Sequence, residues 1–411
     1  MTTAHDDDEE PAAMRLTPKP ELEAFRMKVR AFVAEHAPGV KTHSGVRAPG
    51  PALMPAIREW TAKLYEAGFL GIDWPAEYGG RPDAHPLEPS VVAEEIARAR
   101  TWPPVGAASL ASGALLDFGT DEQRAHFLPR IRACEDVWCQ LFSEPGAGSD
   151  LAALRTRARR EGEAGSDDEV FVVDGQKVWT TNGQHADMGY LLARTDSEAP
   201  KHKGITAFAL DMRSPGVGIR PLREITGTTD FNEVFLDGVR IPAANVIGKV
   251  NDGWRVAMSS LGRERSGVAA RGAELLAVLD DLVRLAEATP VGGRPALDDS
   301  ATRQTIGELA ARVQVNAAMI SLAQSRMLHG TEEASAGLLG KIFFSELNHD
   351  LTDFGLRLQG TDGMLIEGDA GAVAGGWWQD AHLYARAYTI AGGANEVLRT
   401  QVAERGLGLP R

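Results

Sequence analysis

The sequence predicts a chain of three regions, in which two helical regions flank a β-rich one. Two observations predict this order. Apolar residues recur every three or four positions before about residue 133 and again after about residue 250, which is typical of amphipathic helices. Between these stretches lie short runs rich in Val, Ile, Phe and Thr, separated by turn residues, which is typical of strands. Because strands and helices do not alternate, we do not expect a doubly wound parallel sheet.

The first region is expected to be a helical domain over residues 19–136, preceded by an unstructured acidic tail over residues 1–18. The tail has no apolar segment, so we do not interpret it as a signal peptide. A helix is predicted from Glu21, where the apolar residues lie three and four positions apart on one face. These residues are Leu22, Phe25, Val29 and Phe32, and similar patterns recur at 56–67, 90–99 and 107–118.

The second region, residues 137–246, is expected to be a compact antiparallel β domain. Its strand-like runs are "EVFVVDGQKVWTT", "MGYLLART", "GITAFALDM" and "FNEVFLDGVRI". The charged segment "RREGEAGSDDE" between the first runs is interpreted as a solvated hairpin loop.

The third region, residues 247–411, is expected to be helical again. A long helix is predicted over 253–287, followed by the Gly/Pro-rich interruption "ATPVGGRPALDD" and helices over 302–329 and 337–358. No strand is followed by GxGxxG and no GxxxxGK[ST] occurs, so neither a Rossmann nor a P-loop nucleotide site is expected.

Composition excludes several classes of function. The 411 residues are 43% hydrophobic with a formal net charge of -14, and no basic segment rich in aromatics suggests nucleic-acid binding. No stretch approaches the roughly 18 apolar residues of a membrane span. The two cysteines, Cys134 and Cys139, do not form a CxxC pair, so no metal site is expected. We interpret them as reduced thiols and expect a cytoplasmic protein.

The segment "SEPGAGSD", residues 143–150, has the composition of a ligand-binding loop. Gly146 and Gly148 would let the backbone approach a ligand, while Ser143, Ser149 and backbone N–H groups would hydrogen-bond a carbonyl or a phosphate. The alternative interpretation is a simple turn.

The segment "GQKVWTTNG" follows about thirty residues later. Trp179 and Thr181 share one side of a strand by the period of two, so they would cover a flat ring system and bond one of its nitrogens. The alternative is an aromatic side chain on the buried face of a sheet.

Near the C-terminus, "TIAGGANEV" contains two glycines that favour a turn before a helix. Neither Gly392 nor Gly393 has a side chain for proton transfer.

These motifs, with "ARTD" and "KHKGITAF" and the three-region order, resemble the acyl-CoA dehydrogenase family of flavoproteins from about Glu21 to Arg411. The resemblance implies an N-terminal helical domain, an antiparallel β barrel-like domain and a C-terminal four-helix bundle, usually in a tetramer. It also implies FAD as cofactor and oxidation of the Cα–Cβ bond of an acyl-CoA thioester, as in the β-oxidation of fatty acids. Electrons would leave through an electron-transferring flavoprotein.

Carried over by position, the resemblance assigns site residues. Trp179 would lie against the flavin ring and Thr181 would bond its N5, while Ser149 would serve both cofactor and substrate. The remaining cofactor contacts would be Leu141, Phe142, Ser143, Gly148, Gln359, Gly360, Gly363, Ala394, Asn395 and Glu396. The further substrate contacts would be Arg265, Gly392 and Gly393.

The catalytic base is the sharpest question that the resemblance raises. Many members carry a glutamate where this chain has Gly392, whereas isovaleryl-type and long-chain members carry it on a helix of the third domain, before an arginine. Here that position is Glu264, followed by Arg265. Glu264 lies on a predicted apolar stripe of the long helix, which would raise the pKa of its carboxyl group toward that of a general base. The stripe consists of Trp254, Met258, Leu261, Val268, Leu275, Leu279 and Leu282.

The alternative role for Glu264 is a salt bridge, with Arg265 or with another helix. The other nearby acid, Glu396, matches a cofactor-contacting position, but a first-turn glutamate favoured by the helix dipole is an equal interpretation.

Three segments that would hold the far half of FAD depart from the family pattern. An R-x-x-F-G-like stretch is missing, "QGTDG" is only partly kept, and Ala394 and Asn395 replace Thr and Ser. We therefore expect either a homo-oligomer, dimer or tetramer, or a hetero-oligomer with a related chain. Two alternative functions remain on the same scaffold: a flavin oxidase or monooxygenase, and an FAD-poor non-catalytic subunit.

Overall fold

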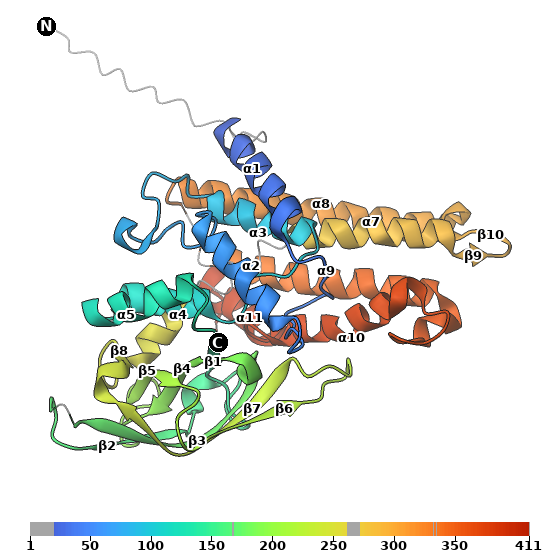
Figure 1. The fold of residues 1–411 in the computed structure, drawn as a ribbon. Coiled ribbons are helices and arrows are strands. Elements are labelled where there is room, and N and C mark those ends of the chain that lie inside the picture. Colours follow the sequence, from blue (N-terminus) through green and yellow to red (C-terminus); the bar gives the residue numbers. More distant parts are fainter. Residues whose placement is uncertain (1–19, 167, 261–271, 332, 334, 411) are drawn as a thin grey trace, which may run out of the picture.

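The computed structural model describes residues 20–166, 168–260, 272–331, 333 and 335–410. A helical region, a β region and a second helical region follow one another, as predicted. In Figure 1 the sheet lies below the helices, with α4 and α5 directly above it and the long helices α7 to α10 stacked to one side. The fold class expected from the sequence is confirmed.

The N-terminal helices pack around a cluster of aromatic and branched side chains. The cluster contains Val29, Trp60, Leu64 and Phe69, which come from α1, from α2 and from the turn after α2. A capping box formed by Thr120 and Gln123 begins α5. The helices are α1 (Pro20–His36), α2 (Met54–Glu66), α3 (Glu88–Arg98), α4 (Ala108–Phe118) and α5 (Asp121–Arg132).

The β region forms a sheet in the order β6-β7-β3-β2-β4-β5-β8, with β1 paired to β4. Most neighbours are antiparallel, as predicted, but β1 and β2 each pair in parallel with β4. The charged segment joins β2 and β3 in an antiparallel pair, as expected of a hairpin. The strands are β1 (Trp138–Leu141), β2 (Arg157–Glu161), β3 (Val170–Thr181), β4 (Met188–Arg194), β5 (Ile205–Asp211), β6 (Val217–Leu222), β7 (Phe231–Pro242) and β8 (Val246–Ile247).

Strand β4 is buried on both faces, and its side chains alternate between two cores. Tyr190 and Leu192 pack into a cluster with α4, α5 and the helical residues 253–260. Leu191 and Ala193 pack into a second cluster, shared among the strands. One face of the sheet therefore packs on the helices, and the other face packs on a core that the strands share.

The third region begins with helical residues 253–260 and continues in α7 (Gly272–Ala288). Both segments lie within the long predicted helix. The Gly/Pro-rich interruption is a small hairpin of β9 (Pro290–Val291) and β10 (Arg294–Pro295). Helices α8 (Ser300–Leu328), α9 (Ala336–Leu358) and α10 (Trp377–Ile390) then join α7 in one apolar cluster, which is the expected bundle. The short α11 (Asn395–Gln401) follows.

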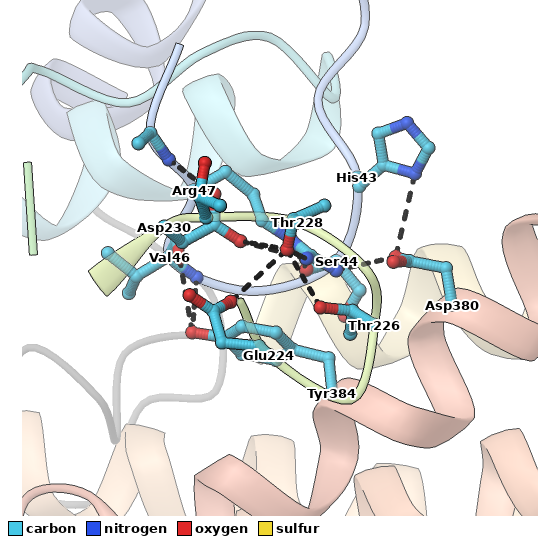
Figure 2. Close-up of polar contacts among 12 residues, drawn as sticks. His43, Ser44, Val46, Arg47, Glu224, Thr226, Thr228, Asp230, Asp380 and Tyr384 are labelled. Carbon is cyan, nitrogen blue, oxygen red and sulfur yellow. Dashed lines mark hydrogen bonds and ion pairs between the residues drawn. The ribbon is translucent and has the colours of Figure 1, made fainter. Parts of the chain in front are cut away.

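A loop between α1 and α2 ties the three regions together around Arg47. The buried Arg47 guanidinium pairs with Asp230, before β7, at 3.1 Å and with Asp380 of α10 at 2.5 Å, as Figure 2 shows. It also lies over the Tyr384 ring, 4.3 Å from the centroid. The Asp230 carbonyl accepts a hydrogen bond from the Asn182 N–H at 3.3 Å. The ends of β3 and β7 are thus held against the bundle.

Both cysteines are buried and free of disulfides. Burial raises the pKa of Cys134 to about 11 and the pKa of Cys139 to about 12. Cys134 packs beside α2, whereas Cys139 lies in the strand core.

Candidate active site

The "SEPGAGSD" loop follows β1 and is anchored by the carboxylate of Glu144. This buried group accepts hydrogen bonds from the backbone N–H groups of Arg155 at 2.6 Å and Thr156 at 2.9 Å. Reciprocal backbone bonds of 3.0 Å between Glu144 and Ala147 close the turn. The conformation of the loop is therefore stabilised by the carboxylate of one of its own residues, Glu144.

A buried lysine on β3 joins this loop to the second predicted motif. The Lys177 ammonium, which is fully buried, donates to Glu144 at 2.8 Å and to the Phe142 carbonyl at 3.0 Å. The next residue, Val178, donates its N–H to the Ser143 carbonyl at 2.9 Å. The structure thus brings the two motifs side by side, as a shared ligand site requires.

The Lys177–Glu144 pair lies away from solvent, and both groups are perturbed. Burial lowers the pKa of Lys177 to about 8, and Glu144 opposes this effect. Burial alone would raise the pKa of Glu144, but the Lys177 charge and the hydrogen bonds lower it. Glu144 therefore stays ionised and serves as the counterion of the lysine.

Trp179 projects from an irregular point of β3. The pairing of β3 with β7 shifts between Lys177 and Thr180, and Trp179 has φ +61°, a strained conformation for a bulky residue. Its indole is 61% exposed and touches Phe231 edge-on, whereas Thr180 is buried and Thr181 is half-buried. The alternative interpretation, an aromatic on the buried face of the sheet, is wrong because the bulge turns the indole outward.

The loop glycines are not required by the packing of the protein. A Cβ atom at Gly146 or Gly148 would meet no atom within 4 Å, and neither residue has a left-handed φ. Neither position therefore needs glycine for its backbone conformation or for its packing. Their bare backbone leaves space that a ligand can fill.

The side chains of Leu141 and Phe142 are not available to a ligand. Leu141 lies in the strand core and Phe142 in the helix-facing core, edge-on to Tyr190. Any cofactor contact at these two residues would therefore use the backbone. Ser143 is half-buried, and Gly148 and Ser149 are exposed.

The glycine turn between α10 and α11 is held by a second buried lysine. Lys341 of α9, 1% exposed, donates to the Gly393 carbonyl at 2.7 Å and to Asn395 Oδ1 at 2.8 Å. Burial lowers the pKa of Lys341 to about 8. The turn itself has left-handed glycines, with φ +66° at Gly392 and +103° at Gly393. A Cβ at Gly392 would meet open space, whereas one at Gly393 would collide with Leu398.

The residues after the turn have distinct surroundings. Asn395 is buried, and its side chain bonds Lys341, Ser345 and Glu346, all on α9. This side chain is therefore directed into the bundle. Glu396 is exposed in the first turn of α11, which fits the helix-dipole interpretation, and Ala394 is half-buried at the N-cap.

The segment Gln359, Gly360 and Gly363 lies at the other end of α9. Gln359 donates to the Gly355 carbonyl at 2.9 Å, and a Cβ at Gly363 would approach the Leu356 carbonyl at 2.7 Å. Eighteen residues separate Gln359 from Lys341, or roughly 27 Å of helix. Within one chain, the structure does not bring this segment to the glycine turn.

Glu264 and Arg265 lie outside the described residues. The helical residues 253–260 that precede them pack on the core beneath Phe142, and Tyr190 Oη lies 3.2 Å from Ser260 Oγ. Of the predicted apolar stripe, Trp254 and Met258 pack against this core, and Leu275, Leu279 and Leu282 are buried in α7. Leu261 and Val268 also lie outside the described residues.

Sequence reasoning did not identify Lys177 or Lys341. A charged residue at a core position of its element is the signal that would have found both. Lys177 lies within a strand run, and Lys341 lies three residues from both Leu338 and Phe344 on the apolar face of α9. In the described part of the chain, no group of three or more His, Cys, Asp or Glu residues could hold a metal ion. No described helix is long and apolar enough to cross a bilayer.

Each of the three regions matches a family model. Family models for the N-terminal, middle and C-terminal domains of acyl-CoA dehydrogenases match residues 19–135, 139–239 and 251–407. The chain therefore belongs to the acyl-CoA dehydrogenase family of FAD-dependent enzymes.

Similar proteins cover the chain almost completely. Acyl-CoA dehydrogenase IpdE1 of Mycobacterium tuberculosis is 36% identical, with 95% of this chain and 98% of that protein aligned. Acyl-CoA dehydrogenase FadE34 of the same organism is 37% identical over 94% of this chain and 51% of its own length. The solved structure of the Tcur3481-Tcur3483 steroid ACAD superimposes with a TM-score of 0.85 at 30% identity, covering 97% of this chain and all of that one. The ChsE4-ChsE5 complex of Mycobacterium tuberculosis gives 0.82 at 29% identity, with the same coverage.

Proposed function

We propose that the protein oxidises the Cα–Cβ bond of an acyl-CoA thioester to the 2-enoyl-CoA and passes the electrons to an electron-transferring flavoprotein. The observation that carries this proposal is the contact between the two motifs, which the buried Lys177 makes. Lys177 and the next residue, Val178, bond the "SEPGAGSD" loop to β3 directly before the exposed Trp179. An open backbone next to an outward aromatic fits a flat ring with a polar edge.

The described residues fit FAD, which would supply a flavin ring able to accept the hydride. Backbone groups of Leu141, Phe142 and Ser143 would bond the polar edge of the ring, Trp179 would cover its face, and Thr181 would donate to it. Gly148 and Ser149 would hold the phosphates or the pantetheine arm. The support is structural: glycines that packing does not require, and a strained, 61% exposed tryptophan.

We propose Glu264 as the base that takes the α proton of the thioester onto a carboxylate oxygen, with Arg265 beside the substrate. Helical residues 253–260, which precede Glu264, pack on the same core as Phe142, a residue of the proposed flavin wall. The turn at Gly392 and Gly393 would provide the facing wall, because it offers backbone and open space but no acid.

The proposed substrate is a bulky or branched acyl-CoA. The small residues Ala391, Gly392 and Gly393 leave room near the turn, and the structurally similar Tcur3481-Tcur3483 protein is a steroid ACAD. We also propose assembly with a related chain. Two structural relatives are complexes of two differently named components, and Gln359 to Gly363 lies at the far end of α9 from the turn.

The test is a visible spectrum of the purified protein, followed by anaerobic addition of a panel of acyl-CoA thioesters. We expect flavin absorbance that bleaches with a preferred substrate, and loss of bleaching with retained flavin in Glu264→Gln. Full turnover in that variant would contradict the assignment of the base.

Two other outcomes would replace the proposed function. Rapid peroxide formation or oxygen insertion on admitting air would indicate an oxidase or monooxygenase. Flavin recovered only on co-expression with a related chain, without bleaching, would indicate a non-catalytic subunit.

A further inference from the structure

The loop between α1 and α2 contains a buried arginine that bonds the β domain and the bundle at the same time. The Arg47 side chain is 4% exposed, and its two terminal nitrogens take different partners. Nη1 donates to Asp230, directly before β7, at 3.1 Å, and Nη2 donates to Asp380, in the first turn of α10, at 2.5 Å (Figure 2). Because the guanidinium group is planar and rigid, it fixes both the distance and the angle between the two carboxylates.

On the β-domain side, Asp230 is connected to the two residues proposed to face the flavin ring. Its carbonyl accepts a hydrogen bond from the N–H of Asn182, which directly follows Thr181, at 3.3 Å. The next residue, Phe231, pairs with Thr181 across β3 and β7 and touches the Trp179 ring edge-on, with 6.0 Å between the centroids. The position of Asp230 therefore influences that of both Trp179 and Thr181.

On the bundle side, the same loop is bonded along α10. The Tyr384 hydroxyl accepts a hydrogen bond from the Val46 N–H at 3.0 Å. One turn further along, Tyr388 donates to Glu274 of α7 at 3.1 Å, and Ser44 donates to the same carboxylate oxygen at 3.4 Å. The glycine turn follows the end of α10, so the loop around Arg47 fixes the helix that carries this turn.

We infer that Arg47 is a positioning residue for the proposed reaction. By holding one carboxylate from each region, it sets the separation between the wall with Trp179 and Thr181 and the wall formed by the glycine turn. The inference rests on the proposed function, because that function makes the two walls the sides of one site. Arg47 acts through Asp230 and Asp380, and the precision of this contact matters because a shift of about 1 Å can slow a reaction about a hundredfold.

The test is a triple variant of the full-length protein, Arg47→Met with Asp230→Asn and Asp380→Asn. It removes the ionic connection between the regions without leaving an unpaired buried charge, so it is expected to fold. Arg47→Lys keeps the charge but not the planar fork and should give intermediate values. The matched control is Arg58→Gln, which removes an ion pair of 2.7 Å with Asp187. Among the described residues, the hydrogen bonds of Arg58 all lie within the N-terminal and β regions.

Three measurements follow the two walls. Hydrogen–deuterium exchange of peptides covering 178–183 and 391–396 reports how firmly each wall is held and needs no cofactor. The fluorescence of the bound flavin reports its contact with Trp179, because an indole that touches a flavin quenches its emission. Anaerobic mixing with an acyl-CoA gives the rate of flavin bleaching. In the triple variant we expect faster exchange in both peptides, brighter fluorescence per bound flavin, and bleaching that is slower by about tenfold to a hundredfold.

Unchanged exchange in both peptides of the triple variant would overturn the inference. Faster exchange with native fluorescence and a native bleaching rate would overturn it as well, since Arg47 would then only stabilise the fold. Changes of equal size in Arg58→Gln would show that any ion pair between regions has this effect.

A failure of the proposed function gives a different result. No acyl-CoA would then bleach the flavin of the native chain. Exchange and flavin fluorescence would still change in the triple variant and stay native in Arg58→Gln, which would support the role of Arg47 in holding the two walls.

Discussion

Two buried lysines hold the two sides of the proposed site, and they differ in their partners. Lys177 of β3 lies between a carboxylate, Glu144, and a carbonyl. Among the described residues, Lys341 of α9 donates hydrogen bonds only to neutral oxygens, those of Gly393 and Asn395, while the charges of Glu396 and Glu346 act on it without an ion pair. Burial lowers the pKa of both lysines to about 8.

Equal burial therefore does not give the two lysines equal electrostatic surroundings. The β-domain side of the site is closed by a neutral ion pair, whereas the bundle side carries a positive charge without an ion-pair partner among the described residues. Removing one member of a buried ion pair leaves the other member as an unpaired buried charge. Removing a buried cation that is bound by neutral hydrogen-bond acceptors leaves no such charge.

The largest expected effect is that of Lys177→Met. It would leave Glu144 as a buried carboxylate without its counterion, at a cost of about 3–5 kcal/mol in the free energy of unfolding. Urea denaturation followed by circular dichroism measures this cost, and flavin content should fall with it. The double variant with Glu144→Gln should recover part of the loss. A cost below about 1 kcal/mol would show that the pair does not anchor the loop.

A smaller loss of stability is expected for Lys341→Met. Two hydrogen bonds to neutral acceptors disappear, at a cost of about 1–3 kcal/mol. Because the Gly393 carbonyl loses its hydrogen-bond donor, the turnover rate should also fall, by more than the loss of folded protein alone explains. Urea midpoints and steady-state rates for the two methionine variants, measured side by side, check the comparison. A larger destabilisation than in Lys177→Met would contradict it.

The pH dependence of stability should also distinguish Lys341→Met from the native chain. The pKa of Lys341 is about 8 when folded and near its usual 10.5 when unfolded, so between these values the unfolded chain binds more protons. The contribution of this group to stability therefore rises with pH from about 8 to 10.5, by at most about 1.4 kcal/mol per pH unit. Urea midpoints at pH 7.5, 8.5 and 9.5 should show this rise in the native chain but not in the variant. Parallel plots of urea midpoint against pH for the native chain and the variant would contradict this contribution of Lys341.

The smallest effect on stability is expected for Gly146→Ala. A Cβ there meets no atom, and the backbone is not left-handed, so the change should stay within about 0.5 kcal/mol. Flavin or substrate affinity should nevertheless fall, because the added methyl group occupies the open side of the loop. Gly393→Ala, with φ +103° and a collision with Leu398, is the destabilising counterpart on the bundle side. Equal stability losses in both variants would contradict the comparison.

The order of the three regions and most of their elements could be predicted from the sequence, because helix and strand periodicities are local. The hairpin over the charged segment and the Gly/Pro-rich interruption after α7 follow from the same local signals. The parallel pairings of β1 and β2 with β4 could not be predicted, since they depend on how distant strands meet.

The candidate site was predictable only in part. Loop residues such as Gly146 and the outward Trp179 carry their signal in the motif. The bulge that exposes the indole, by contrast, depends on the register with β7. Lys177 and Lys341 could not be recognised, because the burial of a lysine is decided by tertiary packing. Asn395 stays a predicted cofactor contact, but the polar partners of its side chain on α9 could not be predicted, because they depend on how the helices pack.

The labelling rates of the two buried cysteines report how often the structure around each of them opens. Their thiols are buried in different cores, and their raised pKa values keep them protonated near neutral pH. A thiol reagent should therefore label the native chain only during transient exposure. Mass spectrometry of the two labelled peptides would time the opening of the strand core through Cys139 and of the packing beside α2 through Cys134. The native cysteines would therefore show, without an engineered probe, which of these two cores opens more often.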